Sequence, residues 1–228
     1  MLTLYRYFGY FGLASLFGTL LYGFRYDPLA PAGNVLIDLA LYAVFGIPHL
    51  AMTREWFKRA LWGERAGTPA ERRLYILVTN VTWLGVFALH RPIGGGFVNF
   101  PEWLRFSGML GMIICLMAFF EGATFSMLDG LLGVPGAGMT HSHGSETPLL
   151  TSGAYGQVRH PMYRAMTLAC LCSLVLHPNM AQVFWSALVA GTFILFIPVE
   201  EGQLIRARGD EYRAYMRQTP YRLFRGVW

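Results

Sequence analysis

Hydrophobic side chains fill six long runs of this 228-residue chain, and polar segments separate the runs. About 20 such residues cross the hydrocarbon core of a bilayer as a helix. We therefore expect membrane spans at residues 8–24, 35–52, 74–90, 106–128, 163–176 and 181–199.

The last two runs form a predicted helical hairpin, because His177 and Pro178 make a turn between them. The run 163–176 is short for a span, so the predicted fold is an all-α membrane bundle of about five to six transmembrane helices. A separate polar helix is expected at 203–218, and residues 53–73 are expected to form a polar loop.

Composition supports the bilayer as the solvent of this chain. Hydrophobic residues make up 54% of it and charged residues 14%, whereas soluble domains carry about 25% charged residues. The formal charge is +5, and arginines gather at 54–73 and from Arg206 onward. Such basic segments flank membrane helices on the cytoplasmic side. Both chain ends and the C-terminal region are therefore expected in the cytoplasm, and nucleic acid is not an expected partner.

The three cysteines, Cys115, Cys170 and Cys172, all lie within apolar runs. This placement indicates buried thiols rather than a disulfide framework. Since no repeat or domain boundary is visible, we expect one integral-membrane domain over residues 1–228. Four spans occupy its first part, 1–130, and the part that holds the candidate chemistry follows at 131–228.

Reactive side chains gather at residues 151–163, TSGAYGQVRHPMY. Pro161 cannot continue a helix from the preceding residues, and it biases His160 toward an extended backbone. A helix is therefore expected to begin here, just after Arg159. Its N-terminus would offer N–H groups and a positive dipole end to an anionic group of a ligand.

Glu200 and Glu201 follow the last span directly, and the hairpin returns them to the membrane face that carries His160. A carboxylate beside aromatic rings such as Tyr155 and Tyr163 suits a ligand with an ammonium or sulfonium group. S-Adenosylmethionine carries both groups and a carboxylate. Pairing of the two glutamates with nearby arginines, as interface anchors, explains the same spacing equally well.

Two further histidines, His141 and His143, lie in a long polar and Gly-rich stretch. Zinc takes three or four protein ligands, so we expect no metal site and interpret the stretch as a lid or cofactor rim. Asp38 and His49 lie near the ends of a predicted span, where a structural or interfacial role is expected.

The segment 151–163, the Glu200-Glu201 pair after a hairpin, and GDEYRAYMRQTPY at 209–221 together resemble the membrane methyltransferases typified by isoprenylcysteine carboxyl methyltransferase. The earlier part is similar to a narrower group, the bacterial methanethiol S-methyltransferases. The matching stretches there are LID at 36–38, WFKR at 56–59 and RPIGG at 91–95. The resemblance covers most of the chain.

This resemblance implies methyl transfer from S-adenosylmethionine, by an integral protein of a bacterial inner membrane whose active site faces the cytoplasm. It implies that the cofactor contacts Thr147, Pro148, Leu149, Leu150, Tyr155, His160, Pro161, Met162 and Tyr163, with Glu200 at its amino end. The candidate catalytic residues are His160, Glu201 and Arg159.

In the isoprenylcysteine enzymes an arginine one helical turn before this glutamate grips the substrate carboxylate, and Phe196 stands at that position here. A carboxylate in an apolar wall without a partner is costly. The expected reaction is therefore in-line attack of a small thiolate on the sulfonium methyl, of the type that converts methanethiol to dimethyl sulfide. Either His160 or Glu201 takes the thiol proton if a base is needed.

Two alternatives stay open. The first is an isoprenylcysteine carboxyl or phospholipid methyltransferase, which uses the same cofactor with a lipophilic acceptor from the bilayer. The second is a membrane protein that keeps the fold without the activity.

Overall fold

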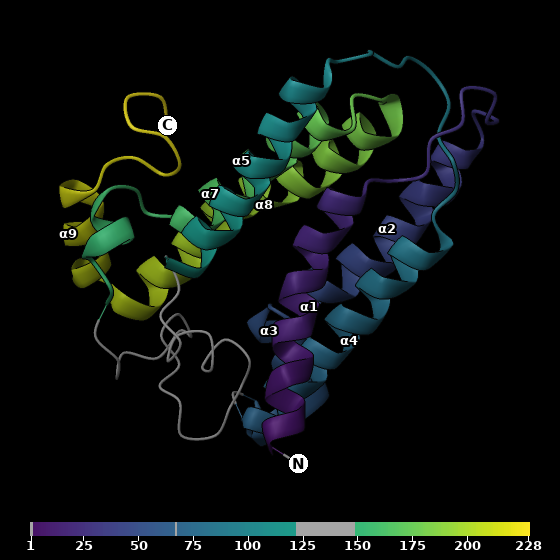
Figure 1. Cartoon of the computed structure of the whole chain (residues 1–228). Helices are drawn as coiled ribbons and strands as arrows, with labels where there is room; N and C mark the ends of the chain where they lie inside the picture. Colours follow the sequence, from purple (N-terminus) through teal and green to yellow (C-terminus); the bar gives the residue numbers. More distant parts are fainter. Residues whose placement is uncertain (1, 67, 122–148) are drawn as a thin grey trace. The chain divides into compact units, whose positions relative to one another are not determined.

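A computed structural model describes residues 2–66, 68–121 and 149–228 (Figure 1). These residues form helices and, apart from two isolated bridges, no β-structure, which confirms the all-α prediction. They divide into two compact units. The first takes in 2–98 with 179–181, and the second takes in 99–121, 149–178 and 182–228. The assignment of one functional domain to the whole chain stays a prediction.

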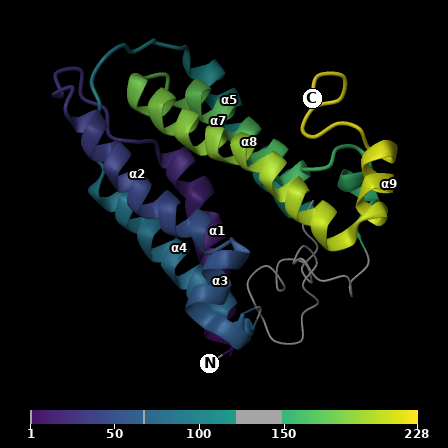
Figure 2. The ribbon, with the colours of Figure 1, turned by 180° about the vertical axis from the view of Figure 1, so that it is seen from behind.

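Three helices lie side by side in the first unit: α1 (Leu2–Tyr22), α2 (Asn34–Ala51) and α4 (Pro69–Leu89), seen from opposite sides in Figures 1 and 2. Helix α1 approaches α4 closely at Gly12, where any Cβ would overlap the side chain of Asn80. Helix α4 begins with a proline at its first turn, the position that tolerates the missing N–H.

A short amphipathic helix, α3 (Glu55–Trp62), lies where a polar loop was expected, so that prediction is wrong. Its apolar residues are spaced as one helical face, and one of them, Trp56, is 67% exposed. On another side of the helix, Lys58 Nζ lies 3.6 Å from the carboxylate of Glu71, which lies in the first turn of α4. A single 3₁₀ turn, η1 (Gly63–Arg65), follows α3.

Two of the motifs singled out in the sequence meet in the first unit. The backbone N–H of Arg91 donates to Oδ1 of Asp38 at 2.8 Å, and Asp38 is fully buried. The side chain of Asn34 donates to the carbonyl of Pro92 at 2.8 Å. The start of α2 therefore fixes the path of the chain after α4, and the structural role expected for Asp38 has this physical basis.

The second unit contains α5 (Glu102–Glu121), α7 (Pro161–Leu176), α8 (Met180–Arg208) and α9 (Asp210–Gln218). Helices α5 and α7 touch at Gly108, where a Cβ would lie 2.9 Å from the carbonyl oxygen of Cys172. Small residues permit such contacts between apolar helices.

Helices α7 and α8 form the predicted hairpin, held by buried hydroxyl and amide groups. The Ser173 and Ser186 hydroxyls lie 3.1 Å apart, and the Gln182 amide donates to the Ser173 hydroxyl at 3.0 Å. Tyr163 of α7 also packs against Phe193 of α8, with ring centroids 5.0 Å apart. These contacts align the two helices and bring the start of α7 to the later turns of α8.

Helix α8 continues well past residue 199, so the prediction of a separate polar helix at 203–218 is wrong. The helix carries Glu200 and Glu201 within its length and ends only at Arg208. Gly209, at φ 56°, then turns the chain into α9, in the left-handed region that glycine adopts at no steric cost. The continuous helix gives both glutamates a rigid backbone.

Three helices in the described part of the chain are long and apolar enough to cross a membrane, namely α2, α5 and α8. Residues 10–22 of α1 and the whole of α7 form shorter apolar helices. The prediction of about five to six spans, and the cytoplasmic placement of the C-terminal region, stay predictions.

Candidate active site

The predicted reactive stretch enters α7 through a short turn and an extended step. The 3₁₀ turn η2 (Gly153–Gly156) places Tyr155 in the interior. His160 occupies the position before the first helical residue at φ −125° and ψ 65°, and Pro161 begins α7. The helix start predicted from Pro161 is therefore present, because proline favours the first turn and restrains the residue before it.

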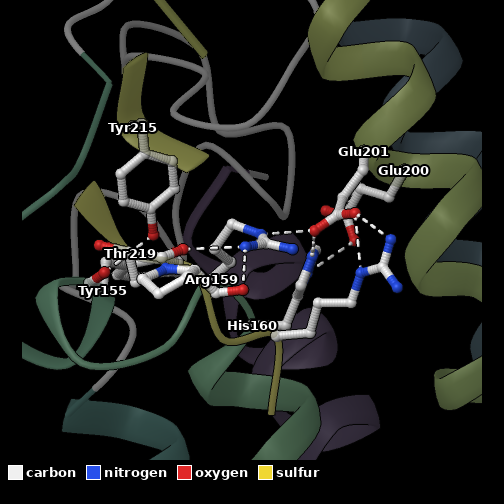
Figure 3. A network of polar contacts seen from close by, with 9 residues as sticks. Tyr155, Arg159, His160, Glu200, Glu201, Tyr215 and Thr219 are labelled. Atoms are coloured by element: carbon white, nitrogen blue, oxygen red, sulfur yellow. Dashed lines mark hydrogen bonds and ion pairs between the residues drawn. The ribbon is translucent and has the colours of Figure 1, made fainter. Parts of the chain in front are cut away.

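Arg159 ties this entrance to the chain that follows α9. Its Nε donates to Oε1 of Glu201 at 2.6 Å, and one terminal nitrogen donates to the carbonyls of Thr219 and Pro220 at 2.8 and 2.6 Å (Figure 3). Its backbone N–H donates to the carbonyl of Tyr221 at 2.9 Å. Arg159 is buried, so it organises neighbouring segments rather than reaching into solvent.

His160 lies between the two glutamates of α8 (Figure 3). Its Nδ1 is 3.5 Å from Oε2 of Glu200, and its Nε2 is 3.3 Å from Oε1 of Glu201. The imidazole stacks on the Tyr163 ring, with centroids 5.4 Å apart and 15° between the planes. Burial alone would lower the pKa of His160, but hydrogen bonds and charge interactions with the two glutamates outweigh burial, so this pKa lies above its ordinary value.

Glu201 is the centre of the charged cluster. Its Oε1 faces Arg159 and His160, while its Oε2 accepts from Nε of Arg222 at 2.9 Å. The Glu201 side chain is 4% exposed, whereas that of Glu200 is 21% exposed. We call Glu201 with Arg159, His160 and Arg222 the Glu201 network. The two adjacent glutamates thus differ: one is enclosed by cations, and the other retains contact with solvent.

Tyr155 connects the entrance of α7 to α9. The Tyr215 hydroxyl donates to the Tyr155 carbonyl at 2.8 Å, and Tyr215 packs in a buried cluster with Leu204 and Tyr212. Leu149 packs against the same cluster. Burial, reinforced by the negative charge of Glu200, raises the pKa of the Tyr155 phenol, so this hydroxyl stays neutral at physiological pH.

The structure brings together most of the residues that the sequence singled out. Arg159, His160 and Tyr163 lie with Glu200 and Glu201. Pro161 is buried at the start of α7, Met162 is half-buried one residue later, and Leu150 is half-buried before η2. The remaining predicted residues, Thr147, Pro148, His141 and His143, lie outside the described residues.

Sequence reasoning weighed a pairing of the two glutamates with nearby arginines but did not single out Arg222, because it treated the arginines after α9 as membrane flanks. The structure shows such pairs at Glu201, with Arg159 and Arg222. One signal was available: two glutamates that directly follow an apolar run need cationic partners if they are buried. Pro220 ends the polar helix just before Arg222, so the chain can turn back toward those glutamates.

Within residues 2–66, 68–121 and 149–228, no three His, Cys, Asp or Glu side chains are grouped closely enough to hold a metal ion. Glu200 offers a partly accessible carboxylate, and Tyr155 and Tyr163 offer aromatic rings, which attract ammonium and sulfonium groups.

No protein-family model matches the chain. Three curated proteins are similar to it. The methanethiol S-methyltransferase of Crocosphaera subtropica is 28% identical over 195 residues, which cover 82% of this chain and 73% of that protein. Methanethiol S-methyltransferase 1 of Bradyrhizobium diazoefficiens is 29% identical over 82% of this chain and 66% of its own length. The methanethiol S-methyltransferase of Mycobacterium tuberculosis is 26% identical over 83% of this chain and 78% of its own length. These similarities confirm the resemblance predicted from the sequence.

Proposed function

We propose that this relative of the methanethiol S-methyltransferases is a membrane methyltransferase that transfers a methyl group from S-adenosylmethionine to a small thiol. The observation that carries the proposal is the meeting of His160 with Glu200 and Glu201, at the entrance of α7, in a chain with this similarity. Two segments 40 residues apart converge there with the charges that a zwitterionic, sulfonium-bearing ligand requires.

The described residues fit the functional groups of this cofactor. Glu200, with a 21% exposed side chain, would hold the ammonium group. The rings of Tyr155 and Tyr163 would face positive charge, and the first turn of α7 would face the carboxylate. S-Adenosylmethionine supplies an electrophilic methyl group when it is bound. The protein contributes by orienting both reactants and excluding water.

The Glu201 network favours a structural and electrostatic role for Glu201 over proton acceptance. A carboxylate enclosed by two guanidinium groups is stabilised in its charged form and is a weak base. His160 is protonated below its raised pKa and cannot accept a proton in that state. The thiolate therefore forms by exchange with water, and activity should increase with pH as a larger fraction of the acceptor thiol is ionised.

The later turns of α8 suit a small neutral acceptor. Phe193 and Phe196 lie two turns and one turn before Glu200 on the same helix face, and Phe193 packs against Tyr163. This aromatic surface provides no cation for a substrate carboxylate. The proposed product is a dialkyl sulfide such as dimethyl sulfide, which is uncharged and soluble in lipid.

We further propose that the protein is an integral protein of a bacterial inner membrane with its active site on the cytoplasmic face. The supporting features are the apolar helices α2, α5 and α8 and the arginines at 54–73 and after Arg206. Cytoplasmic basic segments are the rule for such proteins, and S-adenosylmethionine would reach the site from that side.

An acceptor comparison tests the proposed function. Purified protein in detergent is given S-adenosylmethionine with either methanethiol, followed by headspace detection of dimethyl sulfide, or a farnesylcysteine analogue, followed by methyl radiolabel. We expect turnover of the thiol and little or none of the prenylcysteine. A larger kcat/KM for the prenylcysteine contradicts the thiol assignment and supports the isoprenylcysteine alternative. Turnover of neither, without cofactor binding, supports the non-catalytic alternative.

A further inference from the structure

Arg222 approaches the second oxygen of Glu201 from a segment that follows α9. Its Nε and one terminal nitrogen both lie 2.9 Å from Oε2 of Glu201, while Arg159 and His160 face Oε1. Both Arg222 nitrogens therefore converge on one oxygen of Glu201 in charge-assisted contacts, and the other oxygen is held by separate cations. The orientation of Glu201 is therefore set from both sides.

The 219–228 segment is held in place by backbone hydrogen bonds rather than by the ion pair alone. The backbone N–H of His160 donates to the carbonyl of Arg222 at 3.0 Å. The carbonyl oxygen of Trp228 accepts the N–H groups of Arg222, Leu223 and Phe224 at 2.9–3.2 Å. Leu223 is 1% exposed, so the segment packs as part of the unit.

Trp228 supports the Arg222 side chain directly. The guanidinium carbon of Arg222 lies 5.0 Å from the centroid of the Trp228 ring, within the range of a cation–π interaction. The 219–228 segment therefore carries the cation and the aromatic surface on which it rests.

Exposure separates this pair from the surface ion pairs of the same unit. The side chains of Arg222 and Glu201 are 28% and 4% exposed, whereas those of Arg213 and Asp210 in α9 are 52% and 97% exposed. Water screens the latter pair, and such pairs contribute little. The charge of Arg222 acts on Glu201, and through Glu201 on His160, largely without screening.

We propose that Arg222 is a positioning residue of the cofactor site, which orients Glu201 so that His160 stays between Glu201 and Glu200, and that Trp228 holds Arg222 for this role. This role of Arg222 and Trp228 rests on the proposed function, because Glu200 is the proposed anchor of the cofactor ammonium group. Arg222 itself need not touch the cofactor.

The first test is calorimetry of S-adenosylmethionine binding to the full chain in detergent. Arg222→Gln should weaken binding by about tenfold, the usual effect of losing one charge-assisted hydrogen bond. Arg222→Lys, which keeps the charge without the planar fork, should recover part of the affinity. The matched control is Arg225→Gln, since Arg225 is an exposed arginine of the same segment, and its affinity should be unchanged. Equal affinities for Arg222→Gln and Arg225→Gln overturn the proposal.

The second test needs no cofactor: the titration of His160, followed by NMR with labelled histidine and assigned with His160→Asn. Arg222→Gln should move the titration midpoint upward, because Glu201 then gives more of its negative charge to the imidazolium. Arg225→Gln should leave the midpoint in place. An unmoved midpoint in Arg222→Gln overturns the positioning role.

The two tests also separate this inference from the proposed function. If the unaltered protein does not bind S-adenosylmethionine, the proposed function fails, and the His160 titration still decides whether Arg222 positions the network. If Arg222→Gln does not fold, Trp228→Ala is compared with Trp228→Phe, because phenylalanine keeps an aromatic face for Arg222. A midpoint shift in the alanine variant alone supports the proposal, and the absence of a shift in both contradicts it.

Discussion

Each of the two units buries a carboxylate in a helix, yet the two carboxylates have different partners. Asp38 in α2 is 0% exposed and accepts the backbone N–H of Arg91. The whole residue Glu201 in α8 is 3% exposed, and its carboxylate faces two guanidinium groups and an imidazole. A backbone amide carries no net charge and belongs to one loop, whereas the cations around Glu201 come from two separate segments.

The difference in partners predicts how far the effect of changing each carboxylate extends through the structure. Asp38 fixes the path of one loop, and the consequences of changing it should stay local. Glu201 joins the entrance of α7, helix α8 and the 219–228 segment through charges, so changing it should disturb all three. A buried charge that loses its partner costs far more than a neutral hydrogen bond.

The largest expected effect follows from Glu201→Gln. This change leaves Arg159 and Arg222 facing a neutral amide, and breaking a buried ion pair costs about 3–5 kcal/mol in the free energy of unfolding. Denaturant unfolding in detergent micelles measures that loss, and binding of S-adenosylmethionine should disappear with it.

The matched control is Glu211→Gln, because Glu211 pairs with Arg208 at 3.2 Å but is itself 53% exposed. Exposed pairs contribute at most about 1 kcal/mol. Equal losses of stability in the two variants would show that the cations around Glu201 add nothing beyond a surface pair.

A smaller effect is expected at Asp38. Asp38→Ala removes the acceptor of the Arg91 N–H, at a cost of about 1–3 kcal/mol in unfolding free energy. Asp38→Asn keeps a carbonyl oxygen for that N–H and should cost less. Both variants should bind S-adenosylmethionine within about twofold of the unaltered protein. Loss of cofactor binding in Asp38→Asn would contradict the claim that changes at Asp38 have only local effects, in contrast to changes at Glu201.

The smallest effect is a pH dependence of stability from His160. The pKa of His160 is raised in the folded state by Glu200 and Glu201, which outweigh the effect of burial. Arg159 and Arg222 also pair with Glu201, and the Tyr163 ring stacks on the imidazole. Protonated His160 therefore contributes fully to the stability of the folded state below the ordinary histidine pKa of about 6.5. This contribution is lost as pH rises through the raised pKa of the folded state. Thermal unfolding between pH 6 and 9 should show this decline, and His160→Asn should flatten it. An identical profile in the variant contradicts the role of His160.

The sequence predicted those parts of the molecule that follow from short-range pattern. Pro161 placed the start of α7, and His177-Pro178 placed the turn of the hairpin. The hairpin then placed His160 near Glu200 and Glu201, since two antiparallel helices return the chain to one face.

The two errors in secondary structure have a common physical cause: charged residues were taken as breaks in a helix. Glu200 and Glu201 do not end α8, because a helix can continue past its apolar part while its glutamates find cationic partners. The residues of α3 were assigned to a loop for their arginines, although Trp56, Phe57, Ala60 and Leu61 are spaced as one helical face. Arg222 was missed because its contact with Glu201 depends on tertiary folding across 21 residues.

The central claim is that adjacent glutamates divide two tasks, with Glu201 holding the site together and Glu200 receiving the cofactor. Calorimetry with S-adenosylmethionine, combined with denaturant unfolding of the same samples, tests this claim through Glu200→Gln. Loss of the charged partner of a buried ammonium group costs about 2–5 kcal/mol of binding, so affinity should fall more than about tenfold. Unfolding free energy should fall by less than in Glu201→Gln, because the Glu200 side chain is 21% exposed and lies 3.5 Å from His160, whereas the Glu201 side chain is 4% exposed and pairs with two guanidinium groups. Unchanged affinity, or a loss of stability equal to that of Glu201→Gln, would contradict the account.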